Sequence, residues 1–435
     1  MNTTRDKYST SRVLYIIEAA VEYFIAILVG TTYLAKLCSN IGISDSTTGI
    51  LTSFISLGFG FQFFALFIPC KNGSKRLVTL LAVVNQAAFC FLYLVPVFDI
   101  SKNAKTAIFI ILLLLAEIVK NLACPIQSTW LINLIDDDKR GVFTAKKEIV
   151  SLLSGMLVSL FMGRIIDSYE EKGDLNTAFI LGGITLFVLV GIHTMLLLLI
   201  KERPVQMPAG FNAKMQFKQA LTNKNILAII PLFVIYNMAT YSTTPFYGTY
   251  QINDLKFSMT FVALLSIMYA IVRALVSIPM GKLADKYSFA TMLNLCYAIS
   301  VAAYCVNIFT NPSNGKVMYT VYYCLTAISM AGINSAASNL VYDYVPRSLR
   351  TGAFAVKNTF AGFAGFFTTL AFSPLLAYIQ ANGNSFLGIE NVYGQQVLSA
   401  IGAFLKIMCI VYLNLVVKKL HKPSPTENAE ENPAA

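Results

Sequence analysis

The chain has 435 residues, of which 56% are hydrophobic and 13% are charged, and its formal net charge is +11. Soluble domains carry about 25% charged residues, so this composition argues against a soluble helical protein and for one that lies in a lipid bilayer. The basic residues are spread over many short loops rather than gathered on one face, which argues against nucleic acid as a partner.

Twelve apolar segments of membrane-spanning length follow one another along the chain. An open sheet cannot span lipid and these segments are too long for barrel strands, so we expect each to be an α-helix. The predicted spans cover residues 12–37, 46–69, 76–98, 104–135, 143–167, 176–200, 226–251, 258–281, 288–309, 316–345, 352–379 and 393–417.

The distribution of lysine and arginine over the loops predicts the orientation. Most of these residues fall on the side that holds the N-terminus, and the side with the excess of lysine and arginine is the cytoplasmic side. The loops and flanks of the opposite side hold Lys36, Lys102, Lys105, Lys172, Lys256 and Lys316. We therefore expect a multi-pass protein of the plasma membrane, such as a bacterial inner membrane, with both termini in the cytoplasm.

The longest inner connection divides the chain into two halves of six spans. It contains Pro204 and Pro208, followed by "NAKMQFKQALTNKN", in which we expect a short basic interfacial helix. The predicted organisation is an N-terminal six-helix bundle over 1–200, a cytoplasmic central loop over 201–225, a C-terminal six-helix bundle over 226–417 and a disordered cytoplasmic tail over 418–435.

The two halves repeat each other at a constant offset of 210 residues. Arg140 matches Arg350, Lys147 matches Lys357, and Ile68-Pro69 matches Ile278-Pro279. Two six-helix repeats related by an axis along the membrane normal are the architecture of one transporter class. The fold class predicted is an all-α membrane protein with twelve transmembrane helices in two pseudo-symmetric six-helix bundles.

The loop after the eighth span carries a recognisable motif. "GKLADKYS" contains Gly281, Leu283, Ala284, Asp285 and Lys286 at the spacing G-x-L-A-D-R/K. With the twelve spans and the duplicated halves, the chain resembles the major facilitator superfamily over nearly its whole length. Ser288 stands where glycine is usual and the trailing basic pair is absent. The resemblance implies the fold and leaves the substrate open.

Polar side chains at helical spacing mark the first, fourth, seventh and tenth spans, and in the superfamily these four helices line the central cavity. The first span carries Glu18 and Glu22, one turn apart, and Pro245 is expected to break the helix ladder of the seventh. The candidate cavity residues are Glu22, Glu117, Lys120, Asn121, Gln127, Tyr236, Asn237, Tyr241, Arg273, Asn334 and Ser338.

Glu22 is the first candidate for a proton-coupling residue and Glu117 the second. Glu22 lies about 15 Å along its helix from Arg12, and a charge at the bilayer centre costs about 2.5–3.5 kcal/mol. Alternatively, Glu117 pairs with Lys120 as a structural ion pair, and Glu18 is an interfacial carboxylate. His193 is interpreted as a hydrogen-bonded structural residue rather than a proton relay, and Lys406, in the twelfth span, has no assigned role.

Charged residues in four inner loops, which form two matching pairs, make a candidate cytoplasmic gate. Lys75 or Arg76 is expected to face the acidic run 136–138, and Asp285 is expected to face Arg347 or Arg350. The alternative is that these are positive-inside residues with incidental acids. The predicted gate residues are Lys75, Arg76, Asp136, Asp137, Asp138, Arg140, Gly281, Asp285, Lys286, Arg347 and Arg350.

The sequence predicts a secondary active transporter that moves a small organic solute by alternating access. Protons are the expected coupling ion and Na+ the alternative, and import of a sugar-like or mixed polar solute is favoured over the alternative, a proton-antiport exporter of drugs or metabolites. A membrane enzyme fits less well, because no HExxH or G-x-S-x-G motif occurs, and without a G-x-x-x-x-G-K-[ST] motif ATP hydrolysis is unsupported. A receptor fits less well, because such a protein usually carries a soluble output domain and none is predicted here. We expect no cofactor, no metal centre and a monomer.

Overall fold

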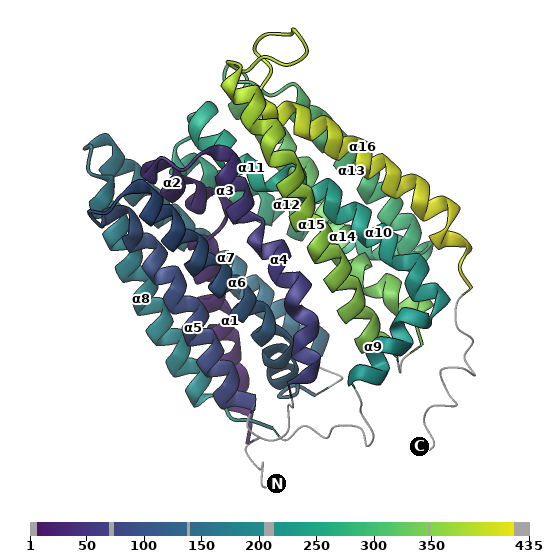
Figure 1. Ribbon diagram of the computed structural model, residues 1–435. Coiled ribbons are helices and arrows are strands. Elements are labelled where there is room, and N and C mark those ends of the chain that lie inside the picture. Colours follow the sequence, from purple (N-terminus) through teal and green to yellow (C-terminus); the bar gives the residue numbers. More distant parts are fainter. Residues whose placement is uncertain (1–6, 69–73, 137–139, 204–212, 347–348, 422–435) are drawn as a thin grey trace, which may run out of the picture. The chain divides into compact units, whose positions relative to one another are not determined.

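Helices make up almost all of the described chain in the computed structural model, which describes residues 7–68, 74–136, 140–203, 213–346 and 349–421 (Figure 1). Twelve helical segments are long and apolar enough to cross a membrane. The predicted number of spans and the all-α fold class are thereby confirmed, and no strand occurs within the described ranges.

The helices form two compact units, and the first consists of Met1–Ser44, Ile68–Phe211 and Phe257–Leu264. We call this unit 1. Its elements are α1 (Ser9–Leu28), α2 (Thr31–Ile41), α5 (Ser74–Leu94), η2 (Val95–Val97), α6 (Lys102–Ile132), α7 (Arg140–Glu171), α8 (Leu175–Leu199) and the start of α12 (Met259–Lys286).

Unit 2 consists of Asp45–Phe67, Asn212–Lys256 and Leu265–Ala435. Its elements are α3 (Asp45–Thr52), α4 (Phe54–Phe61), η1 (Gln62–Phe67), α9 (Ala213–Thr222), α10 (Lys224–Tyr241), α11 (Thr244–Thr249), η4 (Tyr250–Asp254), the remainder of α12, α13 (Phe289–Ile308), α14 (Gly315–Tyr344), α15 (Arg350–Ala381), α16 (Gly394–Leu415) and η6 (Val417–Lys419).

Two local predictions for the middle of the chain are confirmed. The central loop contains the helix α9, and the seventh span is broken beside Pro245, where α10 ends at Tyr241 and α11 begins at Thr244. Proline lacks a backbone N–H and is therefore accommodated in the first turn of a new helix, where that N–H would have no partner.

Unit 2 contains a close approach between the second predicted span and the eleventh. Figure 1 shows α3 and α4 beside α15. A Cβ atom on Gly362 would lie 2.4 Å from the backbone nitrogen of Gly60, and Ser56 Oγ donates to the Gly362 carbonyl at 2.8 Å. Small residues let membrane helices approach this closely. The second span therefore packs with helices of the second half of the sequence, and the predicted division into bundles 1–200 and 226–417 stays a prediction.

Candidate functional site

Five polar side chains meet inside unit 1, and we call them the Glu18 cluster: Glu18, Glu22, Gln86, Gln127 and His193. They come from α1, α5, α6 and α8. Glu18 and His193 are 0% and 1% exposed, Gln86 and Gln127 are also buried, and Glu22 is half-buried at the edge. Glu18 is therefore an interior residue of unit 1, and its level relative to the lipid headgroups stays a prediction.

A buried apolar cluster next to these residues explains why they converge. Tyr15, Trp130 and Leu197 pack together from α1, α6 and α8. On each of these helices, the polar residue of the Glu18 cluster lies three or four positions from the apolar one. That spacing places both side chains on the same helix face, so the packing that joins the helices also turns the polar groups toward one another.

Glu18 is the centre of the hydrogen bonds in the cluster. Gln127 Nε2 donates to Glu18 Oε1 at 2.9 Å and to Glu22 Oε2 at 3.3 Å. His193 Nε2 lies 3.0 Å from Glu18 Oε1, and Gln86 Nε2 lies 3.0 Å from His193 Nδ1. One amide therefore bridges two carboxylates, and one imidazole joins Glu18 to a second amide.

These contacts define the tautomer of His193. The amide nitrogen of Gln86 can only donate, so Nδ1 accepts and Nε2 carries the hydrogen that Glu18 receives. A proton added to Nδ1 would need an acceptor in place of the amide nitrogen. Gln86 Oε1 is buried and without a hydrogen-bond partner among the described residues. A rotation of the Gln86 amide by 180° would present this oxygen, so the cluster can accommodate either charge state of the imidazole.

No lysine or arginine forms an ion pair with Glu18 or Glu22 in the described part of the chain. One ligand atom each from Glu18, Glu22 and His193 lies within 4.8 Å of the others, so the group has the dimensions of a cation site. In this arrangement, however, His193 Nε2 carries the hydrogen that it donates to Glu18, so the same atom cannot ligate a metal ion. The arrangement favours a proton, or a small cation held by the carboxylate oxygens.

The remaining predicted residues of α6 are arranged differently. Glu117 is buried, its Oε2 atom has no hydrogen-bond partner among the described residues, and no ion pair joins it to Lys120. Glu117 and Lys120 thus make no direct ion pair in the described structure, and their electrostatic pairing on α6 stays an alternative. Asn121 donates to the Glu117 carbonyl at 2.9 Å, one turn back on its own helix.

Unit 2 contains a cavity of about 160 Å³ between α10, α13, α14 and α15. Three predicted residues line it, Tyr236, Asn237 and Asn334, together with Tyr297, Lys357 and Asn358. The predicted residues Tyr241, Arg273 and Ser338 are not among its lining residues. Residues of the sequence stripes on the seventh and tenth spans therefore line this cavity, and its assignment as a substrate cavity stays a prediction.

Four residues that the sequence analysis did not assign to a site belong to these two sites or adjoin them. Gln86 and His193 complete the Glu18 cluster, and Lys357 lines the cavity of unit 2. Lys406 lies behind the cavity wall, with its Nζ atom 3.4 Å from the centroid of the Tyr236 ring. A polar residue in the middle of an apolar span was the available signal for Gln86, His193 and Lys406. Lys357 gave no such signal, because a lysine near the predicted cytoplasmic start of a span is expected from the positive-inside rule alone.

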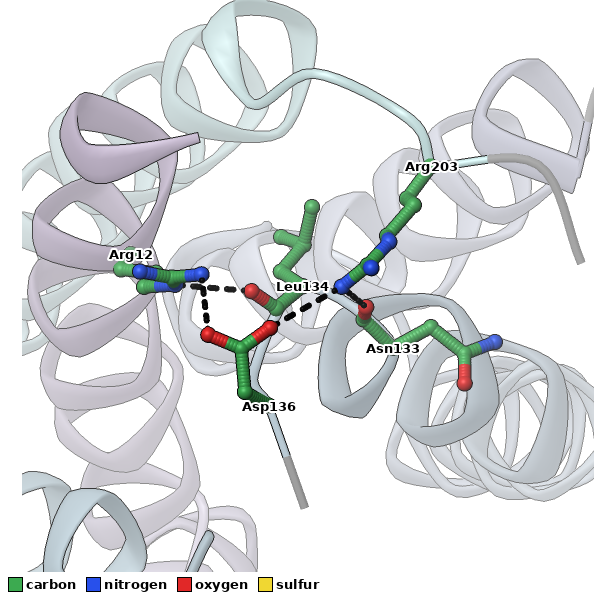
Figure 2. Close-up of polar contacts among 5 residues, drawn as sticks. All are labelled: Arg12, Asn133, Leu134, Asp136 and Arg203. Carbon is green, nitrogen blue, oxygen red and sulfur yellow. Dashed lines mark hydrogen bonds and ion pairs between the residues drawn. The ribbon is translucent and has the colours of Figure 1, made fainter. Parts of the chain in front are cut away.

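The first half of the predicted gate has different partners from those expected (Figure 2). Asp136 pairs with Arg12 at 3.1 Å and with Arg203 at 3.4 Å, and Arg12 Nε also donates to the Leu134 carbonyl at 2.8 Å. Lys75 donates to the carbonyl of Leu198. The expected pairing of Lys75 with Asp136 is therefore wrong, because the guanidinium groups at the start of α1 and after α8 occupy that carboxylate.

In the second half of the gate, Arg350 donates to the carbonyls of Tyr342 at 3.0 Å and Val345 at 3.3 Å. No ion pair joins it to Asp285, although both are described. Because Arg347 lies outside the described residues, the pairing of Asp285 with one of these two arginines stays a prediction. Asp137, Asp138 and Arg347 lie outside the described residues, as do the side chain of Arg140 and the predicted tail from residue 422 onward.

Two carboxylates at the predicted outer ends of spans tie the sequence halves together within each unit. In unit 2, Asp45 accepts from Asn253 Nδ2 at 2.6 Å and from Gln380 Nε2 at 2.8 Å. In unit 1, Asp167 accepts from the backbone nitrogens of Met259 and Thr260, both at 2.7 Å, and so caps the start of α12. Each carboxylate belongs to the first half of the sequence and each donor to the second.

Comparison with known proteins gives a family and a set of similar folds. A family model described as Major Facilitator Superfamily matches residues 13–428. No curated protein sequence matches the chain significantly.

Three solved structures illustrate the similarity of fold. The nucleoside transporter NupG has a TM-score of 0.71 and 12% identity, covering 94% of this chain and 100% of that chain. A bacterial homolog of the human lysosomal transporter Spinster, inward-facing and unoccupied, has a TM-score of 0.68 and 12% identity, covering 97% and 100%. A D-xylose-proton symporter has a TM-score of 0.67 and 14% identity, covering 93% and 97%. At these identities the similarity shows the fold alone.

Proposed function

Because the chain belongs to the Major Facilitator Superfamily and is a multi-pass membrane transporter, we propose that it moves a small organic solute by alternating access, driven by a proton gradient. The coupling group is the Glu18 cluster. Glu22 keeps its role as the proposed coupling residue, Glu18 joins it, and Glu117 remains the second choice.

The observation that carries this proposal is that two acids share hydrogen bonds to one amide and form no ion pair with a described lysine or arginine. Gln127 bridges Glu18 and Glu22, and α1 places both within a membrane-spanning segment. Ionisable residues inside membrane helices are costly and mark substrate or ion pathways. The half-buried Glu22 gives the cluster an edge at which a proton can enter, and Glu18 with His193 provides an interior position for it.

The walls of the unit 2 cavity support a polar organic solute. Tyr236 and Tyr297 supply aromatic faces, while Asn237 and Asn334 supply amides. This combination suits the sugar-like or mixed polar solute predicted from the sequence. Import is the proposed direction, and a proton-antiport exporter is the alternative.

Alternating access requires the two sequence halves to rock against each other. The hydrogen bonds of Asp45 and Asp167 join those halves, so we propose that both sets break when the transporter opens on its predicted outer side. Hydrogen bonds to a charged group such as a carboxylate contribute about 1.5–3 kcal/mol each. A solute can shift the equilibrium between the two states only by as much as its affinities for them differ.

Uptake into proteoliposomes tests the proposal. Purified protein is reconstituted, and uptake of each solute that stabilises it in a melting assay is followed under a proton gradient, a Na+ gradient or no gradient. Accumulation driven by the proton gradient and abolished by a protonophore is expected. Accumulation driven by Na+ alone would contradict proton coupling, and the absence of any gradient-driven movement in either direction would contradict active transport.

A further inference from the structure

The cavity of unit 2 contains a positive charge without an acidic partner. Lys357, from the second turn of α15, lines the cavity, and its Nζ atom lies 4.5 Å from the ring centroid of Phe233 and 4.9 Å from that of Phe354. No aspartate or glutamate lines the cavity, and no ion pair is formed by Lys357 within the described ranges. Two aromatic faces thus hold an ammonium group whose hydrogen-bond donors remain available.

A second lysine lies behind the same wall. Lys406 on α16 is 2% exposed, its Nζ atom donates to Thr240 Oγ1 at 3.1 Å, and it lies 3.4 Å from the centroid of Tyr236 and 5.8 Å from that of Tyr297. Both tyrosines line the cavity. No carboxylate in the described part of the chain pairs with Lys406. A buried charge with only a hydroxyl and two rings around it is costly unless a counter-charge lies nearby.

The amides of the wall are also available to a ligand. The side chains of Asn237 and Asn334 line the cavity and make no hydrogen bond to another described residue, whereas Asn358 donates to Gln62 Oε1 at 2.7 Å. A volume of about 160 Å³ holds a group of a few heavy atoms rather than a whole drug-sized solute, whose pockets measure about 300–1,000 Å³. The cavity therefore fits one end of a solute, and its chemistry is that of an ammonium beside amide donors.

We propose that the transported solute carries a carboxylate or phosphate group, and that this group binds in the unit 2 cavity against Lys357. Its oxygens accept from the Lys357 ammonium and from the amides of Asn237 and Asn334, since charge-assisted hydrogen bonds are the strongest available here. Lys406 is a positioning residue: it acts through Tyr236 and adds positive charge behind the ring. The inference rests on the proposed function and names the class of its solute. The polyhydroxylated part of the solute then extends out of the cavity.

Matched pairs of compounds test the inference on the purified full-length protein. The pairs are glucose with glucose 6-phosphate, glucose with gluconate, uridine with uridine monophosphate, and benzamide with benzoate. The phosphate and carboxylate arms distinguish the two anionic groups. Dissociation constants are obtained from the concentration dependence of the melting temperature. At least one anion is expected to bind more tightly than its neutral partner.

The variants decide which residue is responsible. Lys357→Gln should weaken binding of that anion about tenfold, the effect of losing one charge-assisted hydrogen bond, and should leave the affinity of the neutral partner unchanged. Lys406→Met should reduce the preference for the anion over its neutral partner, whereas the conservative variant Lys406→Arg should retain that preference. A merely structural role would change the affinities for both members of a pair equally. Lys316→Gln is the control, because Lys316 is an exposed lysine of α14.

The inference is overturned if no anion in the panel binds more tightly than its neutral partner, or if Lys357→Gln keeps the full preference. Its failure is distinguishable from failure of the proposed function. Binding and gradient-driven uptake of a neutral solute without anion preference would contradict the inference alone. Lys357-dependent anion binding without gradient-driven uptake would contradict the proposed function alone.

Discussion

His193 Nε2 donates to Glu18 Oε1 over 3.0 Å, and this bond joins α8 to α1 in the interior of unit 1. The bond links two of the ionisable residues in the cluster that we propose to couple solute movement to protons. The same bond should stabilise unit 1. Glu18 has no exposed surface, so water cannot replace the imidazole donor if that donor is lost.

Replacement of His193 should therefore destabilise the protein. His193→Leu removes the donor to Glu18 and leaves the Gln86 amide unpaired, and an unsatisfied buried polar group costs about 1–3 kcal/mol. A lower melting temperature in detergent is expected. The control is Thr194→Val, since Thr194 lies next in the chain and its hydroxyl donates to Val190 on the same helix. Equal melting temperatures for the two variants would contradict a contribution of the Glu18–His193 hydrogen bond to the stability of the protein.

The contacts of Asp136 should be measurable as weak, separable couplings. Arg12 and Arg203 approach opposite oxygens of its carboxylate, and all three side chains are partly exposed. Exposed ion pairs contribute about 0.2–1 kcal/mol in double-mutant cycles. Cycles of Asp136→Asn with Arg12→Gln and with Arg203→Gln should each return a coupling in this range. A cycle of Asp136→Asn with Lys75→Gln should return none, and a clear coupling there would restore the pairing expected from the sequence.

Loss of the Asp45 carboxylate should loosen the segments that it holds. Asp45→Ala leaves the amides of Asn253 and Gln380 without their acceptor, so backbone opening around both residues becomes easier. Hydrogen–deuterium exchange should become faster in 250–256 and 376–384. Asp99→Ala serves as the control because Asp99 is exposed in a connecting loop. Unchanged exchange in both segments of the Asp45 variant would rule out that the Asp45 hydrogen bonds hold these segments in place.

The sequence predicted the fold well because the signals for it are local. A run of about twenty apolar residues specifies a membrane helix regardless of its neighbours, and Pro245 breaks its helix by removing one N–H. The candidate sites depend on which helices pack together. Glu22 and Gln127 were found because each belongs to a polar stripe, whereas the role of His193 follows from the approach of α8 to α1. The sequence repeat suggested Lys75 or Arg76 as the partner of the acidic run 136–138, whereas the folded chain brings Arg12 and Arg203 to Asp136.

The central proposal is that protons are coupled to solute movement through Glu18 and Glu22. The measurement compares two reactions of Glu18→Gln and Glu22→Gln in proteoliposomes: exchange of labelled for unlabelled solute, and accumulation driven by a proton gradient. Both variants keep the shape of the side chain and remove its charge, so exchange should continue while accumulation is lost. Glu390→Gln, at an exposed position between α15 and α16, should retain both reactions. Normal gradient-driven accumulation by both cluster variants would contradict the account.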